Sequence, residues 1–225
     1  MDKIKTAFFY QDALDINKAR VEHLDKLGID LKNKSILETG CGGIGDVTTK
    51  LLTYTDNITL NDARIENIEH LMDNINRRLY YNTNDLNEKC EGNYDVIFSV
   101  GTLYHLHKPA EAIKYMAQSA REMLILSTCT NGYDNGISFP REEGQNQSFT
   151  GTGCRPGRLW VKNELEKHFK YVYFINYSPR HSDFPQDWSH QPTNGLARFM
   201  MIGSHMELDN SNLTTELPVV YKDMS

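Results

Sequence analysis

A glycine-rich turn between two regular elements holds the residues with the clearest chemical potential. Glycines occupy positions 40, 42, 43 and 45, after an apolar strand pattern at 35–39 and before a helical pattern at 47–53. Glycine lets the backbone turn sharply and approach a ligand closely, and the first N–H groups of the following helix have no intrahelical partner. Strand, glycine turn and helix in this order are typical of a nucleotide-type cofactor site.

Two acidic residues near this turn bear on which cofactor it binds. As G-x-G-x-x-G, glycines 40, 42 and 45 fit a dinucleotide fingerprint, and Asp62 ends a second strand pattern at 58–60, about the expected distance onward. Glu38, two positions before the first glycine, is not part of that fingerprint. An NAD-binding protein therefore stays open as one alternative.

The run Glu38-Thr39-Gly40-Cys41-Gly42 resembles motif I of the class I S-adenosylmethionine (SAM)-dependent methyltransferases. In that family the acidic strand end faces the methionine ammonium of SAM, and the glycines face the cofactor backbone. Gly43 departs from the usual Gly-x-Gly-x-Gly loop as an extra residue, which leaves the backbone contacts of Gly43 and Gly45 undefined. The resemblance implies SAM as the cofactor.

Alternating strand and helix patterns are expected to position this turn. Further strand patterns lie at 79–81, 94–100 and 123–128, and helical patterns at 65–75 and 109–120. This alternation predicts an α/β fold, a doubly wound sheet with ligands at the carboxyl ends of its strands. By resemblance to the methyltransferases, patterns at 171–175 and 197–202 would add an antiparallel edge hairpin, which gives a seven-stranded, mostly parallel, Rossmann-like sheet.

The fourth strand pattern and the segment after it extend the resemblance. Tyr94–Ser99 followed by Leu103-Tyr104-His105-Leu106 resembles small-molecule and wobble-uridine methyltransferases. Asp85 matches the position at which methyltransferases commonly bind the adenine amino group, although by itself it is better explained as a helix N-cap. The predicted cofactor residues are Glu38, Gly40, Cys41, Gly42, Gly43, Gly45, Asp62, Ala63, Asp85, Leu86, Ser99, Val100 and Gly101.

His105 is the candidate catalytic residue. Methyl transfer is a nucleophilic displacement at a sulfonium, so the protein chiefly aligns the acceptor and removes a proton only from a hydroxyl-like acceptor. His105 follows the carboxyl end of the fourth strand, where acceptor atoms meet the methyl group in this fold. The alternative is a histidine that hydrogen-bonds to the backbone and shapes the pocket.

Residues 129–158 are rich in glycine and proline and are predicted to form a substrate lid, because structureless loops of this length are usually functional or disordered. Arg155 and Arg158 would either clamp an anionic acceptor or tie the lid to surface carboxylates. The segments around 153–169 and 181–188 resemble a bacterial subgroup of methyltransferase-domain proteins, a resemblance that spans residues 8–203. The predicted substrate-binding residues are Tyr104, Arg155, Arg158, His181 and Trp188.

Composition limits the remaining possibilities. With 225 residues and 39% hydrophobic content, the chain supports one core, predicted as a domain at 1–203 with a polar, flexible tail at 204–225. No apolar run approaches the ~20 residues of a membrane span, and the N-terminus lacks a signal-peptide pattern, so a cytoplasmic protein is expected. The four cysteines are scattered, and no metal site is predicted, although His181 and His190 with Asp183 and Asp187 are a weak alternative.

The formal net charge of −6 argues against extended binding to a phosphate backbone, which needs clustered cations. The leading hypothesis is a SAM-dependent methyltransferase that acts on a small-molecule or sugar-containing (glycan) acceptor, at oxygen. The alternatives are a tRNA-modifying enzyme of the wobble-uridine type and a non-catalytic protein that binds SAM or NAD. The identity of the acceptor and the oligomeric state stay undetermined at this point.

Overall fold

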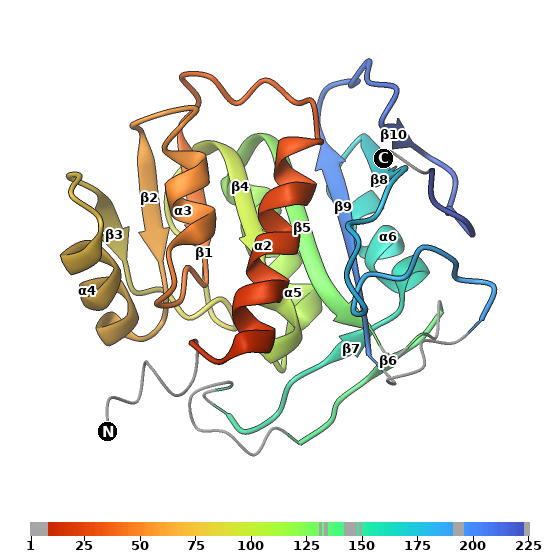
Figure 1. Cartoon of the computed structure of the whole chain (residues 1–225), viewed down its shortest axis with the longest axis horizontal. Helices are drawn as coiled ribbons and strands as arrows, with labels where there is room; N and C mark the ends of the chain where they lie inside the picture. Colours follow the sequence, from red (N-terminus) through yellow and green to blue (C-terminus); the bar gives the residue numbers. More distant parts are fainter. Residues whose placement is uncertain are drawn as a thin grey trace.

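A mixed eight-stranded sheet forms the centre of the computed structural model, which describes residues 9–130, 132, 135–141, 148, 150–190 and 196–222 (Figure 1). The spatial order of its strands is β10-β8-β9-β5-β4-β1-β2-β3. The strand bounds are β1 Ile36–Thr39, β2 Ile58–Asn61, β3 Tyr80–Asn82, β4 Tyr94–Val100, β5 Ala120–Thr130, β8 Tyr171–Ile175, β9 Ala197–Ser204 and β10 Leu213–Thr214. Strands β3, β2, β1, β4 and β5 run parallel, whereas β9 runs antiparallel to both β5 and β8.

Helices cover both faces of the sheet. One face packs against α2, α3 and α4, and the other against α5 and α6. Alternation along β4 explains this arrangement, because Val96 and Phe98 join the first core cluster while Ile97 joins the second. The helix bounds are α2 Gln11–Asp25, α3 Asp46–Leu51, α4 Ile65–Asn74, α5 Pro109–Ser119 and α6 Arg158–Glu166, with a 3-10 turn η1 at Leu103–His105. The predicted doubly wound, mostly parallel sheet is confirmed.

The C-terminal segment adds a strand that the sequence patterns did not predict. β10 pairs antiparallel with β8 and so becomes the sheet edge. Asn210 and Asn212 donate side-chain hydrogen bonds to the carbonyl oxygens of Leu27 and Lys26, just beyond α2. Residues 204–222 therefore lie against the domain, rather than beyond a boundary at residue 203; the flexibility of this segment stays a prediction.

The structure departs at both ends from the bounds predicted for the lid, residues 129–158. β5 continues to Thr130, so residues 129 and 130 belong to the central sheet. A separate two-stranded sheet joins β6, Ile137–Ser138, to β7, Arg155–Pro156. Much of the intervening segment lies outside the described residues, and its role as a lid stays a prediction.

Candidate functional site

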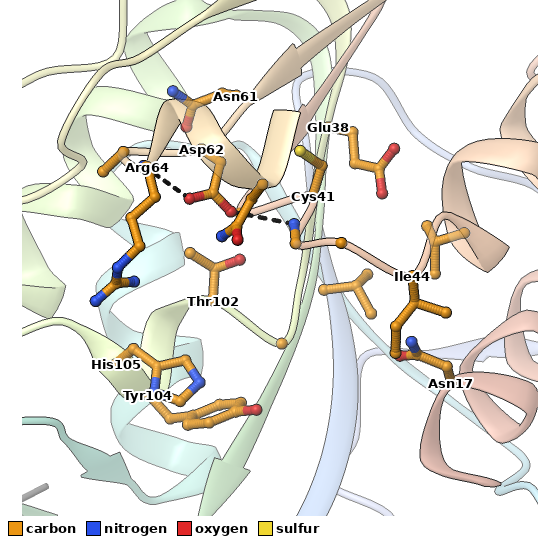
Figure 2. A pocket seen from close by; sticks show the side chains of 18 of the residues that line it. Asn17, Glu38, Cys41, Ile44, Asn61, Asp62, Arg64, Thr102, Tyr104 and His105 are labelled. Carbon is orange, nitrogen blue, oxygen red and sulfur yellow. Dashed lines mark hydrogen bonds between the residues drawn. The ribbon is translucent and has the colours of Figure 1, made fainter. Parts of the chain in front are cut away.

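A cleft lies at the carboxyl ends of β1, β2 and β4 and is closed on one side by α2 (Figure 2). Together with the part open to solvent it holds about 1240 Å³ of empty space. This position is the topological switch point, where neighbouring strands send their chains to opposite sides of β1. Except for Ser99, every predicted cofactor residue lines this cleft.

The glycine turn fits tightly against the loop that follows β4. Gly40, Gly42 and Gly45 have φ values of 60°, 61° and 84°, in the left-handed region that favours glycine. A Cβ at Gly40 would lie 2.1 Å from the Thr102 Oγ1. That hydroxyl donates a 2.8 Å hydrogen bond to the Thr39 carbonyl oxygen, which fixes the β4 loop beside the end of β1. Glycine at position 40 is therefore what allows the two strand ends to approach.

Glu38 lies buried at the end of β1, only 4% exposed (Figure 2). The Thr48 Oγ1 donates a 2.7 Å hydrogen bond to the Glu38 Oε2. Burial raises the pKa of Glu38 to about 8, because removal from water disfavours the ionised form more than the Thr48 hydrogen bond stabilises it. A cationic group placed beside Glu38 would restore its ionised form.

Asp62 follows β2 and holds the glycine turn from its other side. Its two carboxylate oxygens accept hydrogen bonds from the backbone N–H of Gly42, at 3.1 Å, and of Arg64, at 2.9 Å (Figure 2). Burial raises the Asp62 pKa, and these hydrogen bonds oppose the shift. Asp85 also lines the cleft, and its Oδ1 accepts hydrogen bonds from the Asn87 backbone and side chain, both at 2.9 Å.

Asparagines that sequence reasoning missed complete this end of the cleft. The Asn61 amide donates to the Asn82 Oδ1 at 2.6 Å and to the Asn84 carbonyl oxygen at 3.1 Å. These contacts connect the end of β2 to the loop after β3. Uncharged amides at strand ends give no sequence signal beyond their position. The register between β2 and β3, in which Asn61 pairs with Asn82, is what brings them together.

Tyr104 and His105 lie on η1, across the cleft from Glu38 and Asp62 (Figure 2). Their ring centroids are 4.0 Å apart, with an interplanar angle of 49°. Both side chains are half-buried. Behind this turn, the Cys154 backbone N–H donates to the Tyr104 carbonyl oxygen at 2.8 Å, and the Cys154 Sγ donates to the Leu103 carbonyl oxygen at 3.1 Å. The segment before α6 thus supports the turn that carries His105.

Four of the five predicted substrate residues do not line the cleft: Arg155, Arg158, His181 and Trp188. The Arg155 Nη1 donates to the carbonyl oxygens of Tyr104 and Cys154, at 3.1 and 2.8 Å. The His181 Nδ1 accepts from the Asp183 backbone N–H at 3.1 Å, within its own loop. These contacts are structural, and they do not support the predicted anion clamp by Arg155 and Arg158.

Arg158 is almost fully buried, at 2% exposed. Its Nη1 donates to the Pro218 carbonyl oxygen at 2.7 Å, and its Cζ lies 4.0 Å from the centroid of the Trp188 ring. This guanidinium therefore connects α6 to the loop that carries Trp188 and to the C-terminal segment.

We expect Arg158→Met to destabilise the fold and to spare the cleft. The lost charged hydrogen bond and cation–π contact would cost about 3 kcal/mol, or roughly 6–12 °C in melting temperature for a domain of this size. Thermal unfolding followed by circular dichroism measures this. Lys162→Met, at a half-buried position of the same helix where the lysine pairs with Glu166 of that helix, is the matched control. An unchanged melting temperature together with lost acceptor use would return Arg158 to the substrate site.

Three arginines that sequence reasoning did not single out line the cleft: Arg20 on α2, Arg64 just before α4 and Arg198 on β9. The Arg20 Nη1 donates to the Asn17 Oδ1 at 2.7 Å, and the Arg198 Nε pairs with the Asp183 Oδ2 at 3.2 Å. Both guanidinium groups interact with Tyr104. An isolated arginine in a sequence carries no sign of this convergence.

Comparisons with known proteins agree with this geometry. The N-terminal domain of EvdMO1, solved with S-adenosylhomocysteine (SAH) bound, is 20% identical, with a TM-score of 0.60 over 87% of this chain and 82% of that chain. A putative SAM-dependent methyltransferase from Listeria monocytogenes is 14% identical, with a TM-score of 0.63 over 84% and 99%. Magnesium protoporphyrin IX methyltransferase from Synechocystis PCC 6803, solved with SAM bound, is 13% identical, with a TM-score of 0.57 over 91% and 85%.

Sequence comparison finds a shorter match. A tRNA U34 carboxymethyltransferase from Helicobacter pylori is 32% identical over 116 residues, 47% of this chain and 44% of that protein. The chain thus spans less than half the length of the curated relative that it matches. No family model matches the sequence. Among the described residues, no helix is long and apolar enough to cross a membrane. From the strand order, the cleft and these structural neighbours, the chain has the fold of the class I SAM-dependent methyltransferases.

Proposed function

We propose that this protein is a SAM-dependent methyltransferase that transfers a methyl group to an oxygen of a small-molecule or sugar-containing acceptor. The observation that carries the proposal is the buried Glu38 carboxyl beside the glycine turn, in one cleft with Asp62 and Asp85. In this proposal Glu38 holds the methionine ammonium, Asp62 the ribose hydroxyls and Asp85 the adenine amino group. SAM would supply the electrophilic methyl group, and the chain would orient the acceptor toward it.

Electrostatics favour SAM over a dinucleotide in this cleft. A pyrophosphate at the glycine turn would lie near Glu38 and Asp62 and would be repelled when these groups are ionised. The cationic amino-acid end of SAM would instead compensate the buried Glu38. The structural neighbours that hold SAM or SAH support this choice through their shared fold. EvdMO1 was also crystallised with D-fucose present, which supports a sugar-containing acceptor.

Calorimetric titration of the protein with SAM, SAH and NAD tests the cofactor. We expect SAM and SAH to bind and NAD not to bind. A ligand at 100 times its dissociation constant would also stabilise the fold by about 2.7 kcal/mol, so thermal shifts give an independent measurement. Incubation with methyl-labelled SAM and a panel of hydroxylated sugars and phenols then tests transfer. Binding of NAD alone would contradict the proposal.

SAM affinity is expected to rise as the pH rises from 6 to 8. The Glu38 pKa of about 8 means that the free protein carries this carboxyl in its protonated form at lower pH. Binding of an ammonium beside Glu38 requires the ionised form, so each pH unit below 8 should weaken binding up to about tenfold. Calorimetry across this range measures the slope. Glu38→Gln should bind SAM weakly with a flat pH profile; a wild-type profile equally flat would exclude Glu38 from the ammonium site.

A tRNA-modifying activity is the second candidate, favoured by the match to a tRNA U34 carboxymethyltransferase over 116 residues. The net charge of −6 and the partial length of the match weigh against it. Methyl transfer from labelled SAM to total tRNA, compared with transfer to the sugar and phenol panel, separates the two candidates. Incorporation into tRNA alone would favour the second.

A further inference from the structure

Three carboxyl groups, with Arg64 beside them, lie at one end of the cleft, and two further arginines lie at the other. Glu38, Asp62 and Asp85 lie at the ends of β1 and β2 and after β3, where the proposed function places the cofactor. Tyr104 lies across the cleft from Glu38 and Asp62 (Figure 2). Arg20 and Arg198 also line the cleft, and both interact with Tyr104. In a chain whose net charge is −6, this concentration of positive charge inside a cleft has no explanation in overall composition.

The Arg20 guanidinium lies against Gly101, just after the end of β4. Its Nη2 packs so closely on Gly101, which has a φ of 89°, that a Cβ there would lie 2.4 Å from this nitrogen. The Arg20 Nη1 donates to the neutral amide of Asn17. Its Nε is inaccessible to solvent and has no hydrogen-bond partner in the described part of the chain. Burial lowers the Arg20 pKa, because the charged form loses its hydration and the interaction with Tyr104 offsets only part of that loss.

Arg198 completes the cluster from β9. Its Cζ lies 5.3 Å from the centroid of the Tyr104 ring, and its Nε pairs with Asp183 at 3.2 Å. The Arg198 side chain is only 11% exposed and that of Asp183 is 23% exposed. Within the described ranges, Arg20 forms no ion pair, so Asp183 compensates the charge of Arg198 while the charge of Arg20 has no ionic partner. A buried charge of this kind is normally compensated by a counter-ion or ligand.

We propose that Arg20, Arg198 and the Tyr104 hydroxyl form a subsite for a carboxylate group of the methyl acceptor. The charge of Arg20, which has no ionic partner in the described ranges, can be compensated by an anionic ligand, and guanidinium groups bind carboxylates through directional, charge-assisted hydrogen bonds. Arg155 also lies against the Tyr104 ring, with its Cζ 5.5 Å from the ring centroid. Because it donates to main-chain carbonyl oxygens and does not line the cleft, we leave it out of the subsite. The placement of the carboxylate on the acceptor, and not on the cofactor, rests on the proposed function.

Fluorine NMR with fluoroacetate, and with neutral fluoroacetamide as the matched control, tests the subsite in SAH-saturated protein. We expect fluoroacetate to bind, fluoroacetamide not to bind, and fluoroacetate affinity to fall about tenfold or more in Arg20→Gln and in Arg198→Gln. Arg121→Gln, an arginine at the opposite end of the sheet, should bind as the wild type does. Because Arg198→Gln also breaks the ion pair with Asp183, melting curves accompany each variant, and Arg20→Gln, which breaks no ion pair, is the decisive one.

Four outcomes would overturn the inference. Three are equal binding of the acid and the amide, no binding of either, and affinity unchanged in both arginine variants. The fourth is binding of fluoroacetate only when 5′-methylthioadenosine, which lacks the amino-acid carboxylate, replaces SAH; the subsite would then hold the carboxylate of the cofactor. Failure of SAH to bind the wild type would instead reject the proposed function, and the same titration on the ligand-free protein would still test the subsite.

Discussion

Replacing His105 by alanine is expected to lower turnover by about 10²- to 10⁴-fold, the usual contribution of a general base, while SAM affinity changes little. In the proposed mechanism the imidazole takes the proton of an acceptor hydroxyl as the oxygen attacks the methyl group. His105 lines the cleft beside Tyr104, across from the carboxylates assigned to the cofactor. Single-turnover rates with saturating SAM measure the effect without a contribution from product release.

His107 gives a matched control for this experiment. It lies two residues further along the chain, is half-buried, and does not line the cleft. His107→Ala should therefore keep turnover close to the wild-type value. Added imidazole should restore part of the activity of His105→Ala if a base is missing. A loss below tenfold would leave positioning as the whole mechanism, and a loss of SAM binding would make His105 part of the cofactor wall.

Asp62→Ala is expected to weaken SAM binding at least tenfold. The carboxylate would accept charge-assisted hydrogen bonds from the ribose hydroxyls, each worth about 1.5–3 kcal/mol. It also accepts the backbone N–H of Gly42, so its loss would loosen the glycine turn that faces the cofactor. Asp62→Asn, which keeps one acceptor oxygen but no charge, should bind with intermediate affinity.

Calorimetric titration with SAM measures the Asp62 variants, and Asp56→Ala is the control. Asp56 lies in the loop before β2, where it pairs with Arg77 at the surface. An exposed pair of this kind contributes little to stability, so this variant should bind SAM normally. Unchanged SAM affinity in Asp62→Ala would remove Asp62 from the cofactor site.

Local patterns determined most of the fold. Apolar runs such as residues 94–100 predict strands buried on both faces, and their alternation with helical patterns specifies a doubly wound sheet. The glycine turn was equally readable, because positive φ values and close approach restrict positions 40, 42 and 45 to glycine. These features depend on neighbours in the sequence. The sequence therefore also indicated where the cleft would lie, at the carboxyl ends of the strands.

Which side chains at the end of β4 face the cleft could be determined only from the structure. Ser99 was predicted in the cofactor site, but it is fully buried and does not line the cleft. In a strand, residues two apart share a face, and Ile97 packs in the core cluster that contains α5. Ser99 therefore points into the same layer, while Val100 and Gly101 reach the cleft.

Only the tertiary structure shows which side chains from distant parts of the sequence come together in the cleft. Arg20 lies on the helix before the sheet and Arg198 on its penultimate strand, and they meet at Tyr104 because α2 closes the cleft and β9 inserts beside β5. The strand β10 was missed for a similar reason, since two residues paired with β8 give no periodic signal. Sequence patterns record the period of an element but not which distant elements pack together, because that depends on strand order and sheet register.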